Sequence, residues 1–151
     1  CKPIQIWMLI RHGTRMANTK DLLEMKKATE LRDIIVANYE SGNAPSTGAL
    51  CIGDYLAIKN WQWDSSSESQ GDFLNEQGWE DIFTLAQRYS IRYPAIFGGP
   101  YNPEDFYFRH TLTQRTQESC KAFIDGLFGN GSHNNVVIET PLEYDEIIKV
   151  T

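Results

Sequence analysis

Short apolar runs and longer segments of helical periodicity alternate along this chain. Residues 4–10, Ile-Gln-Ile-Trp-Met-Leu-Ile, have the apolar density of a strand that is buried on both faces. Residues 105–109 alternate between apolar and polar positions, and residues 136–138 are all apolar. Both of these patterns predict further strands.

Segments between these runs place their apolar residues three or four positions apart, which predicts amphipathic helices. They cover about 19–39, 47–60, 79–93 and 114–128. Asn18 offers a side-chain cap before the first helix, and Pro94 ends the third.

Strands that alternate with helices predict an α/β fold, with a largely parallel sheet and flanking helices. Residues 1–16 and 72–151 are expected to form parts of one α/β domain. The stretch 17–71 combines two expected helices with a turn-rich break and a polar linker. It is expected to form a helical insertion, or cap, between two parts of the sheet domain.

The composition narrows the class of partner. Apolar content of 41% and charged content of 23% are ordinary for a globular protein of 151 residues. A net charge of −6 argues against a nucleic-acid partner or an anionic membrane surface, since those binders carry a basic excess. No apolar run is long enough to span a membrane. A small anionic substrate stays open, because a few arginines suffice for one positive pocket.

The cysteines and one sequon bear on the compartment. Asn130-Gly131-Ser132 is a glycosylation sequon, which suits a secreted or lumenal protein of the endoplasmic reticulum or lysosome. Cys1, Cys51 and Cys120 show no metal-binding spacing, and their number is odd. In a secreted protein one of them is free or paired outside this chain, and Cys1 is the candidate. Three reduced, buried thiols are the alternative.

The strongest cluster of candidate catalytic residues lies directly after the first expected strand and reads Arg11-His12-Gly13-Thr14-Arg15. Guanidiniums carry a fixed fork of donors that matches phosphate oxygens. Their charge disfavours the protonated form of an imidazole between them. A neutral imidazole beside an anion site is a nucleophile aimed at phosphorus. Gly13 allows close backbone approach. The plainer alternative is two surface arginines and an incidental loop histidine.

A second polar turn, 109–116, also lies between an expected strand and a helix. Ligands of open α/β sheets bind beyond the carboxyl ends of the strands, so this turn and the first are expected to open on one crevice. Arg115 would lie near a helix N-terminus, which favours an anion. Arg109 is either a substrate-binding residue or a surface ion-pair residue. Lys20 either widens the positive pocket or belongs to a solvated helix face.

Three stretches resemble, in order, the successive motifs of the histidine acid phosphatases. They are residues 11–15, 74–79 and 108–119, and within that family they look most like the phytase-like multiple inositol polyphosphate phosphatases. The resemblance implies a phosphoglycerate-mutase-like architecture that this chain holds incompletely, and a small phosphorylated substrate. It implies neither a metal nor a cofactor.

Carried over by position, the resemblance implies that His12 is phosphorylated during turnover and that water then hydrolyses the phosphohistidine. Arg11, Arg15 and Arg115 would hold the transferring phosphoryl group, and Thr14 would line the pocket.

The chain departs from the family pattern in two places. Met16 and Ala17 stand where an aromatic residue and proline usually follow. The late His-Ala-Glu or His-Asp motif that supplies the general acid is absent, and His133 precedes Asn134 instead. Relatives are also much longer. We therefore expect the N-terminal part of an inositol polyphosphate phosphatase whose acid comes from a C-terminal part or a second chain, disulfide-linked through Cys1.

Two other interpretations remain. A truncated or diverged relative would bind phosphorylated or other anionic ligands without catalysis, and the absent acid motif fits it equally well. A phosphoglycerate-mutase-like mutase is the third, although the helical insertion and the sequon suit the acid phosphatases better.

Overall fold

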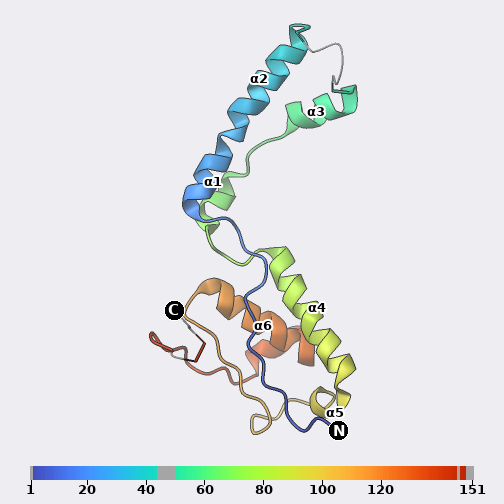
Figure 1. Ribbon diagram of the computed structural model, residues 1–151, viewed down its shortest axis with the longest axis vertical. Coiled ribbons are helices and arrows are strands. Elements are labelled where there is room, and N and C mark those ends of the chain that lie inside the picture. The colour runs from blue at the N-terminus through green and yellow to red at the C-terminus, as the bar shows by residue number, and fades with distance from the viewer. Residues whose placement is uncertain (1, 44–49, 146, 149–151) are drawn as a thin grey trace. The chain divides into compact units, whose positions relative to one another are not determined.

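The computed structural model describes residues 2–43, 50–145 and 147–148. The chain divides into two compact units (Figure 1). One comprises Cys1–Met16 and Asp72–Thr151, and the other comprises Ala17–Gly71. Each unit is described by itself. The assignment of the first as an α/β phosphatase domain and of the second as its cap stays a prediction.

The Ala17–Gly71 unit is helical. It contains α1 (Thr19–Lys26), α2 (Ala28–Glu40), α3 (Ile52–Asn60) and the 3-10 helix η1 (Ser65–Gln70). Asn18 caps α1 by accepting a hydrogen bond from the Asp21 amide at 2.9 Å. The helix expected over 19–39 is interrupted at Lys27, and the helix expected from residue 47 is described only from Ile52.

This unit has a small core. Leu22 and Tyr55 are its buried apolar residues among those described. The Tyr55 ring stacks on Tyr39 with 4.0 Å between centroids, and its hydroxyl donates to Glu40 at 2.7 Å. Lys59 pairs with the same carboxylate at 2.6 Å. The contact between α2 and α3 therefore depends on one aromatic stack and one exposed polar cluster.

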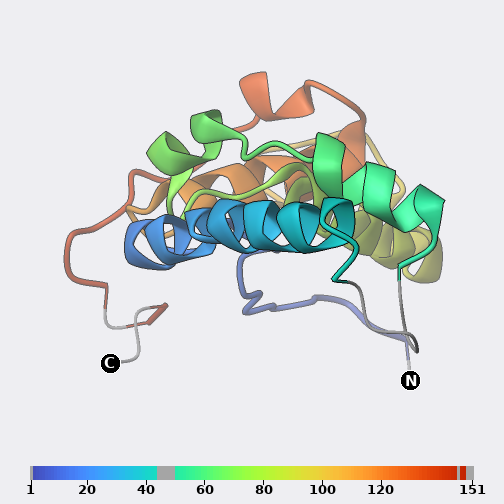
Figure 2. The same ribbon diagram turned by 90° about the horizontal axis from the view of Figure 1, so that it is seen from above.

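The other unit is built on two packed helices, α4 (Glu76–Arg92) and α6 (Gln114–Phe128), with the short α5 (Pro94–Phe97) and η2 (Ser132–Asn134) beside them. The two long helices lie side by side in both views (Figures 1 and 2). Small residues allow the close approach, because a Cβ on Gly126 would overlap the Phe83 carbonyl. The buried cluster between the helices is Ile82, Ala86, Phe97, Ala122, Phe123 and Leu127.

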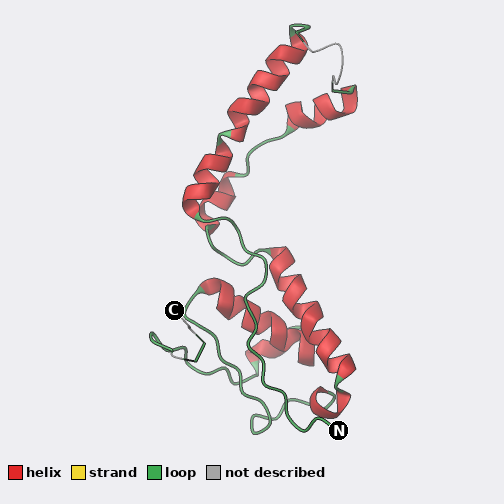
Figure 3. Cartoon of the chain, in the orientation of Figure 1, coloured by secondary structure: helices red, strands yellow, loops and turns green. Residues whose placement is uncertain are grey.

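The expected parallel sheet is not confirmed. Figure 3 draws no strand in the described residues. The only β pairing among them is two isolated bridges, one antiparallel between Arg15 and Leu74 and one parallel between Phe108 and Ile138. A strand exists only where another backbone satisfies its N–H and C=O groups, and apolar residues alone do not supply that partner. The three expected strand segments therefore lack a ladder.

The expectation that 4–10 is buried on both faces is wrong. Ile6 and Met8 pack against the α4–α6 core. Their neighbours point elsewhere, and Ile4 is 94% and Trp7 74% exposed. The alternation follows from the period of two in an extended chain. One face of the segment therefore packs against the α4–α6 core, and the other face is exposed.

The loop after α6 is held by a buried carboxylate. Asp125, 4% exposed, accepts hydrogen bonds from the backbone N–H groups of Gly131 at 3.0 Å and His133 at 2.9 Å. The His133 ring Nδ1 lies 2.9 Å from the same carboxylate. Burial raises the pKa of Asp125, but these hydrogen bonds outweigh it and lower the pKa below the ordinary value. Asn130 is exposed in this loop.

Folding lowers the pKa of Asp125, so the ionised carboxylate stabilises the folded protein. This contribution to the free energy of unfolding is complete above the unfolded pKa of about 3.9, and it is lost as the pH falls through the folded pKa. We expect Asp125→Asn to flatten the fall in unfolding free energy below about pH 4. Asp125→Ala should lower the free energy of unfolding by about 1–3 kcal/mol at neutral pH, because the buried N–H donors lose their acceptor. Urea unfolding across this pH range tests both, with the exposed Asp105→Asn as control. An unchanged slope in Asp125→Asn would contradict the assignment.

Candidate active site

Five consecutive residues surround one cavity. Arg11, His12, Gly13, Thr14 and Arg15 line a volume of about 300 Å³. His12 is half-buried, whereas both arginines are exposed at its sides. The loop thus offers two guanidiniums and one imidazole to a space that can hold a small anion.

One contact of the His12 imidazole indicates which ring nitrogen carries a proton. Its Nδ1 lies 2.8 Å from the carbonyl oxygen of Gly13. A carbonyl oxygen only accepts, so Nδ1 carries the proton. In the neutral ring Nε2 is then left with a free lone pair. This arrangement suits a nucleophilic imidazole.

The exit of this loop is tied to the residues before α4. The Met16 amide donates to the Phe73 carbonyl at 2.8 Å, and the Asn75 amide donates to the Thr14 carbonyl at 3.1 Å. These bonds flank the antiparallel bridge between Arg15 and Leu74. The loop backbone is therefore fixed on one side by main-chain bonds.

The loop also rests on the first turn of α4. A Cβ on Gly78 would overlap the Thr14 carbonyl oxygen, and a Cβ on Gly13 would overlap the Gly78 carbonyl oxygen. Two glycines thus let two backbones touch. The Thr14 hydroxyl donates to Asp81, one turn further along α4, at 3.0 Å. Sequence reasoning assigns no role to Gly78, although a glycine inside a helical pattern signals a packing demand.

The N-terminal turns of α6 hold the loop from another side. The Gly13 amide donates to the Ser119 hydroxyl at 3.1 Å, and that hydroxyl donates to the Arg115 carbonyl at 2.7 Å. The Gln114 side chain accepts from the Leu74 amide at 2.9 Å. Residue 115 is therefore linked to the histidine loop through one serine.

The Arg115 side chain is half-buried at the start of α6. Its Nε is buried and finds no hydrogen-bond partner among the described residues. Arg115 is not among the residues that line the His12 cavity, and the Nε of Arg109 is buried without a partner in the same way, so this atom does not by itself single out Arg115.

Arg109 has a different environment. Its Nη2 pairs with Asp145 at 2.8 Å, with the Asp145 side chain 2% and the Arg109 side chain 17% exposed. Arg109 is not among the residues that line the His12 cavity. The contact favours the ion-pair interpretation, and substrate binding by Arg109 stays a prediction.

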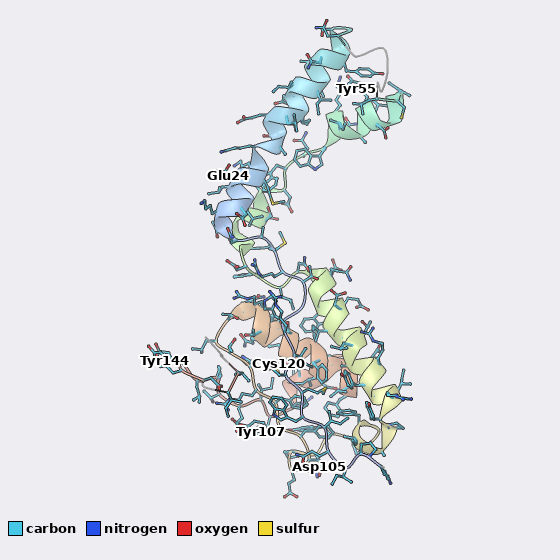
Figure 4. All side chains as sticks on the ribbon, viewed as in Figure 1. Glu24, Tyr55, Asp105, Tyr107, Cys120 and Tyr144 are labelled. Atoms are coloured by element: carbon cyan, nitrogen blue, oxygen red, sulfur yellow. The ribbon has the colours of Figure 1, made fainter. Side chains whose placement is uncertain are left out.

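Lys20 is exposed in the first turn of α1, in the other unit, and its binding role stays a prediction. Cys51 and Cys120 are free thiols, while Cys1 falls outside the described residues. Burial raises the pKa of Cys120, on α6, to about 11, which keeps its thiol unreactive (Figure 4).

The described ranges hold neither a metal-binding cluster nor a membrane-spanning helix. No group of three or more His, Cys, Asp or Glu side chains is placed to hold a metal there. No helix among those residues is long and apolar enough to cross a bilayer.

The comparisons with known proteins settle the family. The family model for the histidine phosphatase superfamily (branch 2) matches residues 4–149. The chain belongs to this superfamily. The resemblance stated above is thus confirmed, and the superfamily implies a phosphoglycerate-mutase-like α/β fold, of which the described residues hold the helices and two bridges.

Curated relatives carry the name multiple inositol polyphosphate phosphatase 1. The one from Drosophila melanogaster is 42% identical over 137 residues, which are 88% of this chain and 29% of the relative. The one from Homo sapiens is 31% identical over 132 residues, which are 85% of this chain and 25% of the relative. This histidine phosphatase chain thus spans under a third of either relative. No solved structure matches it.

The contact between Gly78 and Thr14 makes a prediction about stability. Alanine normally stabilises a helix over glycine by about 1 kcal/mol. We expect Gly78→Ala to destabilise the protein by about 1–3 kcal/mol instead, because the added Cβ displaces the loop.

Gly53→Ala in α3 is the matched control, since its Cβ would meet only Cys51 Sγ at 3.8 Å. Urea unfolding measures both variants. A Gly78→Ala protein as stable as the Gly53→Ala protein would show that the loop does not depend on this contact.

Proposed function

We propose that this chain carries the nucleophilic half of a phosphomonoester hydrolase that works through a phosphohistidine on His12. The observation that supports this most is the hydrogen bond from His12 Nδ1 to the Gly13 carbonyl. In the neutral ring this bond leaves the Nε2 lone pair free, and Arg11 and Arg15 line the same cavity. A weak base becomes an effective nucleophile when its lone pair is held free and aimed.

In the first step the Nε2 lone pair attacks phosphorus and the ester P–O bond breaks. Negative charge spreads over the equatorial oxygens, where Arg11, Arg15 and Arg115 would stabilise it. The link from the Gly13 amide through the Ser119 hydroxyl to the Arg115 carbonyl supports its inclusion. In the second step water attacks the phosphohistidine, inorganic phosphate leaves, and Nε2 regains its lone pair. Thr14 would contribute to the pocket through its backbone, while its hydroxyl is engaged by Asp81.

We propose inositol polyphosphates as the substrate class. The support is the printed name of the two relatives and their identity to this chain. The five loop residues that line the cavity offer guanidiniums and an imidazole for one phosphoryl group. Contacts to further phosphates would have to come from other residues, of which Lys20 is the candidate in this chain.

The general acid would come from polypeptide beyond residues 1–151, either a C-terminal part or a second chain. His133, which lacks the family context, is already engaged by Asp125. Exposed apolar residues on segment 4–10 support a missing packing partner, since Trp7 is 74% exposed. Linkage of such a partner through Cys1 is part of the proposal. A secreted or lumenal protein glycosylated at the exposed Asn130 is the matching location.

A non-catalytic relative that binds phosphorylated or other anionic ligands is the second candidate. The absence of a His-Ala-Glu or His-Asp sequence favours it. The two candidates differ in one respect, which is whether a covalent phosphohistidine forms.

Brief incubation with a ³²P-labelled phosphate ester, followed by quenching and peptide mapping, tests for that intermediate. We expect an acid-labile label on the peptide containing His12, and we expect His12→Asn to abolish the label and lower turnover by at least about 10³-fold.

His110→Asn is the matched control, because the His110 Nδ1 makes the same bond to its own next carbonyl, Thr111 O, at 2.7 Å. Label that survives His12→Asn, or disappears with His110→Asn, would contradict the assignment of the nucleophile. Ligand binding without any label would favour the non-catalytic candidate.

The proposed absence of the acid from residues 1–151 predicts a leaving-group dependence. An alkoxide leaving group needs a proton as it departs, and a general acid that supplies this proton raises the rate by about 10²–10⁴-fold. An aryl oxide departs without one. We expect the isolated chain to be phosphorylated by an aryl phosphate and to be nearly inert toward phytate. Comparable rates with both substrates would show that the chain supplies its own acid.

A further inference from the structure

We infer that Asp72 is a positioning residue that turns the Arg15 guanidinium so that its Nε–Nη2 edge meets the phosphoryl group. This inference rests on the proposed function of the His12 cavity. It concerns a carboxylate outside the three motif stretches 11–15, 74–79 and 108–119.

The contacts of one nitrogen carry the argument. Arg15 Nη1 lies 3.0 Å from Asp72 Oδ1 and donates to the Met16 carbonyl at 2.8 Å. Both contacts are made by Nη1, the first as an ion pair with the carboxylate and the second as a hydrogen bond, and neither Nε nor Nη2 contacts an acceptor among the described residues. The donors left over are Nε–H and Nη2–H, which lie parallel on one edge of the planar group. That edge is the fork that binds two oxygens of a phosphate at once.

The backbone of Asp72 fits this role. Asp72, with φ of 65°, is the one non-glycine residue at positive φ in the part of the chain that the structure describes. Aspartate is among the few residues that tolerate this region, and such strain is retained where the structure requires it. The turn leads directly into Phe73, whose carbonyl binds the Met16 amide at 2.8 Å. The turn thereby places the Asp72 carboxylate next to the Arg15 guanidinium.

The ion pair between Arg15 and Asp72 is too exposed to contribute much to the free energy of folding. The Arg15 and Asp72 side chains are 36% and 44% exposed. An ion pair so accessible to water contributes little to folding. Its effect is on orientation, because an arginine that is already held loses less side-chain freedom when a ligand binds. Removing Asp72 should therefore alter anion binding and leave unfolding almost unchanged.

The test uses the complete natural protein and orthovanadate, which mimics the transferring phosphoryl group. Asp72→Gly removes the carboxylate but accepts a positive φ without strain. Asp72→Asn keeps an acceptor oxygen and also tolerates that φ. We expect Asp72→Gly to weaken vanadate inhibition about tenfold at unchanged melting temperature, and Asp72→Asn to restore most of the loss. Asp105→Asn, with the same change in net charge as Asp72→Asn, should have no effect.

A double-mutant cycle with Arg15→Lys separates positioning from folding of the loop. Lysine has no fork to aim, so Asp72→Gly should cause no further loss in that background. If Asp72→Gly still weakens vanadate binding in the Arg15→Lys background, the inference is overturned and the proposed function is not. The same holds if the Asp72→Gly protein binds vanadate as tightly as the unsubstituted protein, or more tightly. Failure of the unsubstituted protein to bind vanadate and to label His12 would overturn the proposed function, and the inference with it.

Discussion

The backbone contact between the histidine loop and the first turn of α4 is the constraint on which the site depends. At Gly13 and Gly78 there is no room for a Cβ on either side. This contact lets Asn75 and Asp81 reach Thr14 by hydrogen bonds of 3.1 and 3.0 Å. A preorganised site needs its reacting groups held by rigid neighbours, and here a helix terminus provides that support.

The same loop is fixed from α6, so the α4–α6 pair determines both the core and the site. The Gly13 amide reaches Ser119, whose hydroxyl returns to the Arg115 carbonyl. The helices are fixed relative to each other by the cluster that includes Ala86 and Ala122, both fully buried. A change in helix packing would therefore move Arg115 relative to His12. Catalytic geometry and stability are coupled through one interface in this unit.

The sequence predicted the helices of this unit well, because apolar spacing reports directly on one buried face. It also pointed to residues 11–15, which line one cavity, because arginine and histidine have few other reasons to cluster after an apolar run; their chemistry stays a prediction. The sheet was not predictable in the same way, since a strand depends on a partner backbone that residues 4–10 lack here. Gly78 and Asp72 were missed because their roles come from contacts with residues over 50 positions away.

The central claim is that His12 holds a proton on Nδ1 and a free lone pair on Nε2 within an anion-binding loop. Nitrogen-15 NMR of the complete natural protein, labelled at histidine, reports the protonation of each ring nitrogen directly. The account predicts that the neutral His12 ring holds its proton on Nδ1 and leaves Nε2 bare, with the Nε2 resonance of His12 shifting when vanadate is added. A neutral ring protonated on Nε2, or a His12 resonance that vanadate leaves unchanged, would contradict it.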